Sequence, residues 1–258
     1  MHARLLLVVC ALLLPATASA ESRVMCYGDS ITAGADDMFA PENSYPAQLQ
    51  RLRPDLDVVN EGRHGDVSGN LDRFRAALAD WPPQLVVLML GTNDAVCSAA
   101  DTPSCEAATA TPEGTVANLF RMADEARAAG ANVLILTPPP AVCDAACEAR
   151  HDLAFTTTMR HAFTARVADE LLRARPPTGV RVANLRGRLT EASWQGLSLD
   201  GLHPSAEGNR VIAEFVAARI PKAESRRAAK PDTRREAVPA PAPEPDPFVR
   251  RSPGGPPR

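Results

Sequence analysis

Short apolar runs alternate with helical patterns along most of this chain of 258 residues. Each run is nearly unbroken and rich in β-branched residues or leucine, which is typical of strands that are buried on both faces. The alternation predicts one α/β domain with a parallel sheet, helices on both faces and right-handed crossovers. The predicted strands are 24–27, 57–60, 85–90, 132–137 and 180–184, and the predicted helices are 45–52, 71–78, 115–129, 153–173 and 206–218.

The start of the chain differs in composition from this α/β segment. Residues 1–20 combine Arg4, an apolar run over 5–14 and small residues at 18–20, which is the pattern of a secretory signal peptide. The run is too short for a spanning helix, which needs about 20 apolar residues, and no later segment is long enough either. We therefore expect a secreted or periplasmic protein without a transmembrane segment. Cys10 is a weaker indication of a lipid anchor.

The other end also lies outside the predicted domain. Residues 222–258 contain nine prolines, nine Lys or Arg and five Asp or Glu, with Phe248 as the one notable large apolar residue. Such a segment cannot bury enough surface to offset its ordering entropy, so we predict a disordered tail and a domain over 21–221. The tail would be a solvated spacer, or its arginines would attach to a surface. Because the net charge is −3 and the tail is basic, the domain is acidic, which argues against binding to nucleic acid.

Five cysteines remain once the signal peptide is removed, so at least one thiol is free. Cys97 and Cys105 flank a polar stretch, and Cys143 and Cys147 flank three residues, so each pair could close a small disulfide loop in an oxidising compartment. A zinc site is the alternative, but the spacing differs from structural zinc sites and histidines are absent nearby. Cys26, in the first predicted strand, is then the buried free thiol.

Polar residues follow the predicted strands where an open parallel sheet places its ligands, at the carboxyl ends. Ser30 comes after the first strand, and Asp200 and His203 lie three residues apart before the last helix. A serine, an imidazole and a carboxylate are the groups of a serine hydrolase, although spacing alone does not establish a catalytic triad. The polar segments are 28–30, 60–65, 91–94 and 200–203.

These segments resemble the sequence blocks of the SGNH/GDSL hydrolase superfamily of esterases and lipases, and the resemblance covers about 23–220. The first block resembles Gly28-Asp29-Ser30-Ile31-Thr32, with isoleucine where the family name has leucine. The others resemble Asn60-Glu61-Gly62-Arg63-His64-Gly65, Gly91-Thr92-Asn93-Asp94 and Asp200-Gly201-Leu202-His203-Pro204.

The resemblance implies a role for each of five residues. Ser30 would be the nucleophile, His203 the base and Asp200 its partner, while the Ser30 and Gly62 N–H groups and the Asn93 amide would form the oxyanion hole. It also implies a three-layer α/β/α fold with a five-stranded parallel sheet in the flavodoxin-like order 2-1-3-4-5. No metal or organic cofactor is needed for this chemistry.

The activity that the resemblance implies is hydrolysis of carboxylic esters through an acyl-enzyme. The expected substrates are short acyl or aryl esters or lysophospholipids. One alternative is a carbohydrate O-acetylesterase acting on wall polysaccharide, and another is a noncatalytic carbohydrate-binding or envelope protein that keeps the fold. We expect a monomer.

Overall fold

The computed structural model describes residues 22–34, 41–97, 111–142 and 154–221, except for the side chains of 97 and 154–159. The chain divides into residues 1–221 and residues 222–258, and every described residue belongs to the first unit. The predicted signal peptide, the predicted tail and both predicted disulfides therefore lie outside the described residues or side chains. Within the described ranges, no helix is both long and apolar enough to cross a membrane.

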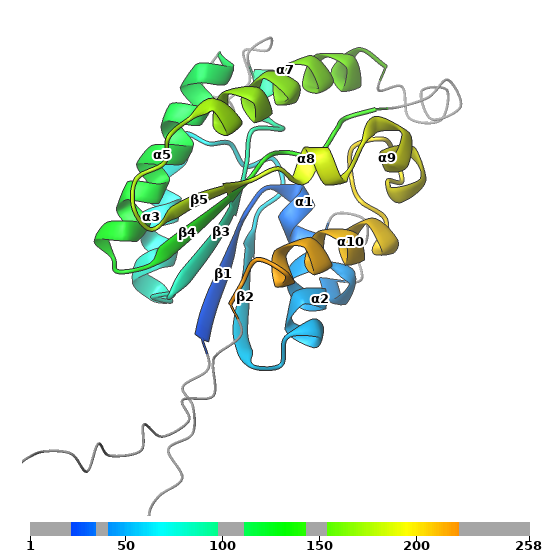
Figure 1. The fold of residues 1–258 in the computed structure, drawn as a ribbon. Coiled ribbons are helices and arrows are strands. Elements are labelled where there is room, and N and C mark those ends of the chain that lie inside the picture. Colours follow the sequence, from blue (N-terminus) through cyan, green and yellow to red (C-terminus); the bar gives the residue numbers. More distant parts are fainter. Residues whose placement is uncertain (1–21, 35–40, 98–110, 143–153, 222–258) are drawn as a thin grey trace, which may run out of the picture. The chain divides into compact units, whose positions relative to one another are not determined.

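Five parallel strands form one sheet in the order β2-β1-β3-β4-β5 (Figure 1). This order and the α/β class confirm the prediction. The strands lie close to the apolar runs because each run places side chains on two faces that helices cover. Their bounds are β1 Ser22–Gly28, β2 Leu56–Gly62, β3 Leu85–Met89, β4 Asn132–Leu136 and β5 Val180–Ala183.

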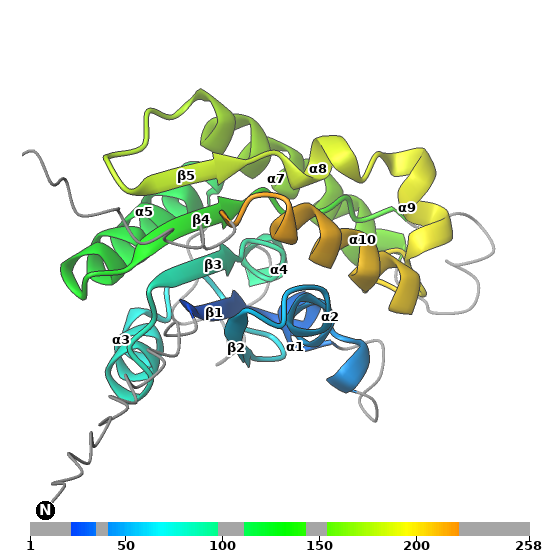
Figure 2. The same cartoon turned by 60° about the horizontal axis from the view of Figure 1, so that its bottom comes forward.

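Helices cover both faces of the sheet, which gives three layers (Figure 2). Alternate residues of β1, β3 and β4 point to opposite faces and form two separate cores. The first core contains α1 Ser30–Ala33, α2 Tyr45–Leu52, α8 Leu185–Arg188, α9 Glu191–Leu197 and α10 Ala206–Ala217. The second contains α3 Leu71–Asp80, α5 Pro112–Ala128 and α7 Ala154–Arg173. The short elements α1, η2 Pro41–Asn43, α4 Asp94–Cys97, α8 and α9 were not predicted.

Strand β2 departs from the prediction in two ways. It lies at the edge of the sheet, so only Leu56 is buried and Asp57 and Asn60 are exposed. The expectation of a strand buried on both faces is therefore wrong for β2. The strand also extends to Gly62, so 60–62 belongs to the sheet and not to the loop that follows it.

The register of the sheet brings the polar segments together. Gly28, the last residue of β1, is paired with Gly62 of β2 on one side and with Met89 of β3 on the other. The Arg63 N–H donates to the Gly28 carbonyl over 3.0 Å, so the chain after β2 stays beside the end of β1. The segments after β1, β2 and β3 consequently leave the sheet at one edge, where parallel α/β proteins place their sites.

Candidate active site

Ser30 is the first residue of α1, directly after the turn at which β1 ends. Asp29 caps this short helix, and its Oδ1 accepts the Ile31 N–H over 2.9 Å. The chain leaves α1 at Gly34 in the left-handed region, with φ at 90°. The serine is therefore held at the carboxyl edge on a helical turn capped at both ends.

The structure brings His203 and Asp200 to this serine, 173 residues along the chain. The Ser30 Oγ lies 3.0 Å from the His203 Nε2, and the His203 Nδ1 lies 2.7 Å from the Asp200 Oδ2. A carboxylate at Nδ1 accepts a hydrogen bond there, so the neutral ring carries its N–H on Nδ1 and presents Nε2 as an acceptor to the serine hydroxyl. The three side chains thus form one hydrogen-bonded series.

Asp200 also holds the backbone of its own loop. Its Oδ1 accepts the N–H groups of Leu202 at 2.9 Å and of His203 at 2.7 Å. Burial by itself would raise the pKa of Asp200, but the hydrogen bonds and charge of His203 and the Leu202 N–H lower it to about 2. The carboxylate therefore remains ionised at neutral pH.

A tryptophan anchors the loop that carries Asp200 and His203. Trp194 is fully buried in α9, and its indole N–H donates to the Gly201 carbonyl over 3.0 Å. The Val142 N–H, which follows β4, donates to the same carbonyl over 2.8 Å. The sequence analysis missed this anchor because an isolated tryptophan in an unpredicted helix shows no pairing with a loop seven residues away.

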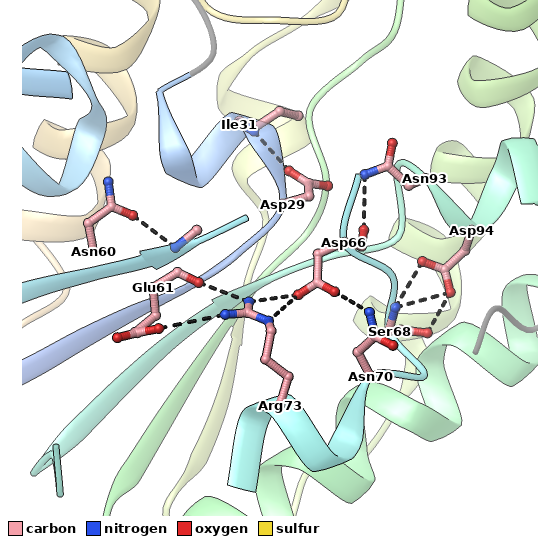
Figure 3. Close-up of polar contacts among 11 residues, drawn as sticks. Asp29, Ile31, Asn60, Glu61, Asp66, Ser68, Asn70, Arg73, Asn93 and Asp94 are labelled. Carbon is pink, nitrogen blue, oxygen red and sulfur yellow. Dashed lines mark hydrogen bonds and ion pairs between the residues drawn. The ribbon is translucent and has the colours of Figure 1, made fainter. Parts of the chain in front are cut away.

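Asn93 lies beside the segment that follows β2 (Figure 3). Its side-chain amide donates to the Asp66 carbonyl over 2.9 Å, and an amide nitrogen carries a second N–H that remains for a ligand. The Asp66 carboxylate, which is fully buried, is held by the Arg73 guanidinium at 2.6 and 2.9 Å and by the Asn70 amide. The position of Asn93 therefore depends on a charged pair that anchors the neighbouring segment.

A second buried carboxylate, Asp94, fastens the same two segments together. It accepts the Ser68 N–H at 3.1 Å and the Ser68 hydroxyl at 2.5 Å (Figure 3). It also accepts the Thr115 hydroxyl at 3.3 Å. Asn118 donates to the Ser68 hydroxyl over 3.2 Å. Burial raises the pKa of Asp94 above its ordinary value, although these hydrogen bonds oppose the change. The loop after β3 is thus fixed at Asn93 and at Asp94, the residue that follows it.

Gly62 does not have the free N–H that the resemblance implied. This N–H donates to the Asn60 Oδ1 over 2.9 Å (Figure 3). A Cβ at Gly62 would lie 2.1 Å from the Ala33 nitrogen, so the glycine allows β2 to pack against the backbone of α1. The reason for the difference is that β2 continues through Gly62, which places this residue in the sheet.

Gly65, in the same segment, has an N–H that is not engaged in this way. It adopts φ of 74°, and its N–H has no hydrogen-bond partner among the described residues. It precedes Asp66, whose carbonyl receives the Asn93 amide, so Gly65 and Asn93 lie on adjoining segments. The sequence indicated this residue, because Gly65 is the last residue of the same Asn60–Gly65 block.

Cys26 is a buried free thiol, as predicted. In the described part of the chain, no group of three or more His, Cys, Asp or Glu could hold a metal ion.

Serine hydrolases have a hydroxyl, an imidazole and a carboxylate in hydrogen-bonded series. Here the series lies at the carboxyl edge of a parallel α/β sheet. Residues 26–211 match the profile of the GDSL-like Lipase/Acylhydrolase family. The chain belongs to this family and is a carboxylic ester hydrolase.

Curated relatives agree with this assignment, and solved structures share the fold. An arylesterase of Vibrio mimicus is 27% identical over 85% of this chain and 98% of its own length. Esterase TesA of Pseudomonas aeruginosa is 37% identical over 53% of this chain and 64% of its own length. The M. smegmatis aryl esterase superposes with a TM-score of 0.57 at 20% identity, covering 77% of this chain and 97% of that one. A carbohydrate acetylesterase family member from Sinorhizobium meliloti gives 0.52 at 23% identity, covering 77% and 96%.

Proposed function

We propose that this protein is a secreted serine esterase that hydrolyses short acyl or aryl esters, or lysophospholipids, through an acyl-enzyme. Ser30 is the nucleophile, His203 the general base and Asp200 the residue that orients it. The observation that carries the proposal is the 3.0 Å contact between the Ser30 Oγ and the His203 Nε2, backed by the 2.7 Å contact from His203 to Asp200. A serine hydroxyl is a weak nucleophile at neutral pH and requires such a base.

In the first half-reaction, the Ser30 oxygen forms a bond to the ester carbonyl carbon as its proton passes to the His203 Nε2. The bond to the leaving alcohol then breaks, and the imidazolium gives that alcohol its proton. Water repeats the sequence on the acyl-enzyme, releasing the acid and restoring Ser30. Asp200 stays ionised and stabilises the imidazolium that forms in each step.

The tetrahedral oxyanion needs donors that point at it before the reaction begins. The Ser30 N–H, the second N–H of the Asn93 amide and the Gly65 N–H are the donors that we propose. Gly65 takes the place first expected for Gly62, because the Gly62 N–H is engaged by Asn60. Loss of one such donor typically lowers kcat by roughly 10²- to 10³-fold.

Export and oligomeric state belong to the same proposal. The signal pattern over residues 1–20 supports release of a mature chain that begins at Glu21. The mass of the protein recovered from the periplasm or medium tests this, since retention of 1–20 would contradict export by cleavage. A monomer is the expected state, and sedimentation of the mature chain tests it.

The test of the enzyme proposal compares the mature protein with Ser30→Ala on p-nitrophenyl acetate, butyrate and octanoate. We expect kcat/KM to fall by about 10⁴-fold or more in a variant that retains the native circular dichroism spectrum. Ser22→Ala, which changes a serine at the start of β1, the opposite end of that strand from Ser30, is the matched control and should keep its activity. Equal activity in the wild-type and Ser30→Ala proteins would remove Ser30 from the mechanism.

Acetylated xylan is included as a further substrate to separate the alternatives. Release of acetate from xylan, with sharply lower activity on butyrate and octanoate, would assign the carbohydrate O-acetylesterase function. Binding to polysaccharide without turnover of any ester would assign the noncatalytic function.

The pH dependence tests the base. Activity should fall in acid because His203 takes up a proton and can no longer accept one from Ser30. Burial also raises the pKa of the neighbouring Asp29 to about 7, so the profile is measured in Asp29→Asn as well. An acid limb that persists in Asp29→Asn supports His203 as the base, and a flat profile from pH 5 to 9 contradicts it.

A further inference from the structure

Arg160 lies in the first half of α7, the helix that connects the carboxyl end of β4 to the start of β5 (Figure 1). Further along α7, Val167 is fully buried and lies within van der Waals distance of a Cβ placed on Gly91, just beyond the end of β3. Residues seven apart share one face of a helix, and two turns span about 10 Å. Arg160 therefore lies on the inward face of α7, beyond the carboxyl edge and on the side of Ser30.

The helical turn that carries Arg160 is fixed in position. The Thr164 hydroxyl is fully buried and donates to the Arg160 carbonyl over 2.7 Å. The Arg186 guanidinium, from α8, donates to the same hydroxyl and to the Pro139 carbonyl, each over 3.2 Å. This cross-link ties α7 to α8 and to the segment after β4. The backbone position of Arg160 is therefore fixed by packed elements.

The Arg160 side chain lacks a direct partner within the described residues. The residue is half-buried, and its Nε is shielded from solvent and makes no hydrogen bond. The other described arginines further along α7 behave differently, since Arg166 is exposed and pairs with Glu113, and Arg173 is exposed and pairs with Glu170. A shielded donor without an acceptor is costly, which is why such groups are rare unless a ligand completes them.

The charges around Arg160 agree with the position that the geometry of α7 gives it, beyond the carboxyl edge of the sheet. The acidic groups whose charge acts on its guanidinium are Asp29, next to the nucleophile, once it ionises near pH 7, and Asp200, the partner of His203. Burial lowers the pKa of Arg160, and these two carboxylates oppose that change without bonding to it directly. Asp200 is already engaged by His203 and its own loop, whereas Asp29 accepts the Ile31 N–H on Oδ1 and has no partner on Oδ2 among the described residues.

We propose that Arg160 forms an anion-binding subsite beside Ser30 and that the preferred substrates are esters that carry a carboxylate or phosphate near the scissile carbonyl. The planar guanidinium presents several N–H donors that match both anions. This inference rests on the proposed esterase function and narrows its substrate class. Of the substrates proposed above, lysophospholipids carry such a charge and simple acyl esters do not.

Two pairs of esters, each differing in charge, test the subsite. 3-Acetoxybenzoate and its methyl ester place the charge on the leaving alcohol, whereas p-nitrophenyl succinate and p-nitrophenyl butyrate place it on the acyl group. We expect Arg160→Gln to lower kcat/KM for the charged member of one pair by about 10- to 100-fold and to leave the neutral member within about threefold. Arg160→Lys, which keeps the charge, should recover part of the loss. Lysophosphatidic acid and the matching monoacylglycerol then show whether phosphate is preferred to carboxylate.

Arg166→Gln is the matched control, since it removes an arginine from the exposed side of the same helix and should leave every ratio unchanged. Equal losses for charged and neutral esters in Arg160→Gln would overturn the proposal, because they would show a structural or electrostatic role without ligand recognition. Unchanged ratios in both pairs would overturn it as well.

Binding to the Ser30→Ala protein gives the same comparison without turnover. NMR titration with 3-acetoxybenzoate and with its methyl ester should show tighter binding of the anion, and Arg160→Gln in that background should abolish the difference. This binding measurement needs no turnover, so a protein that hydrolyses no ester can still bind the anion more tightly than the neutral compound. Failure of the esterase proposal and failure of the anion subsite are therefore distinguished. Equal binding of both compounds to the Ser30→Ala protein would contradict the subsite.

Discussion

Burial changes the protonation of individual side chains in this site. Asp29 is nearly inaccessible, its Oδ2 has no partner among the described residues, and its pKa is raised to about 7, chiefly by burial. The Ile31 N–H and the charge of His203 oppose this rise, while Asp66 and Asp94 add to it. A carboxyl group that stays protonated near neutral pH therefore lies beside the nucleophile.

Asp29 should make the free energy of unfolding depend on pH. An unfolded aspartate releases its proton near pH 3.9, whereas the folded protein retains it up to about pH 7. The contribution of protonated Asp29 to the free energy of unfolding is therefore complete below about pH 4 and is lost as pH rises through 7. We expect the free energy of unfolding, relative to Asp29→Asn, to fall by about 1.4 kcal/mol per pH unit between 5 and 7.

Urea unfolding of both proteins at pH 5, 6, 7 and 8 measures this difference. Asp124→Asn, at an exposed position of α5, is the control and should give a curve parallel to the wild type. A constant difference between wild type and Asp29→Asn across this range would show that Asp29 is ionised throughout.

Cys26 leads to a second prediction at this scale. It is fully buried in β1, and burial raises the pKa of its thiol to about 12. Because the thiolate is the reactive form, iodoacetamide should leave Cys26 unmodified in the native protein at pH 8 and modify it in guanidinium chloride. Peptide mass analysis distinguishes Cys26 from the other cysteines. Rapid native labelling of Cys26 would mean that β1 opens on the time scale of the experiment.

At the scale of elements, the site depends on close contact between β2 and the short helix α1. A Cβ at Gly62 would lie 2.1 and 2.6 Å from the Ala33 nitrogen and Cα, which are backbone atoms and cannot move aside as a side chain would. Helix α1 carries Ser30 at its first position. A displacement of α1 therefore changes the distance from Ser30 to His203.

We predict that Gly62→Ala lowers the free energy of unfolding by about 1–3 kcal/mol and lowers kcat as well, because both depend on the position of α1. Gly196→Ala, in α9, is the control, since its added Cβ would meet nothing within 4 Å. Denaturant unfolding and p-nitrophenyl ester kinetics measure the two effects. A Gly62→Ala protein with wild-type stability would contradict the packing role.

For the molecule as a whole, Arg53 holds the last described residues, 220 and 221, by hydrogen bonds. This buried side chain pairs with Asp55 at 2.7 Å and donates to the Ile220 carbonyl at 2.9 Å and the Pro221 carbonyl at 3.1 Å. These contacts need the chain to continue through Pro221. Nothing in them requires residues 222–258.

A chain that ends at Pro221 should therefore keep the melting temperature and kcat/KM of the full protein within error. A chain that ends at Ala217 should melt several degrees lower, because the Arg53 guanidinium then loses two carbonyl partners in a buried setting. Calorimetry of the two truncated proteins makes the comparison. A lower melting temperature for the Pro221 chain would place the domain boundary further along.

Much of the fold was predictable from local patterns, because each buried strand needs an apolar run and each covering helix needs an apolar stripe. The five longer helices and all five strands were expected near their observed positions. The short helices α8 and α9 were missed because one or two turns leave too little periodicity to detect. Edge exposure of β2 was missed because it depends on the strand's place in the sheet.

The sequence by itself determined the α/β class, the alternation of elements and the residue types of the site, since these follow from hydrophobic period and side-chain chemistry. Only the tertiary structure decided which groups meet. The contact of Ser30 with His203 joins residues 173 positions apart, and Gly62 proved to be engaged in the sheet. The Arg160 Nε proved to be shielded, with no partner in the part of the chain that the structure describes. Burial and hydrogen-bond partners are properties of the packed chain, and no local run of residues encodes them.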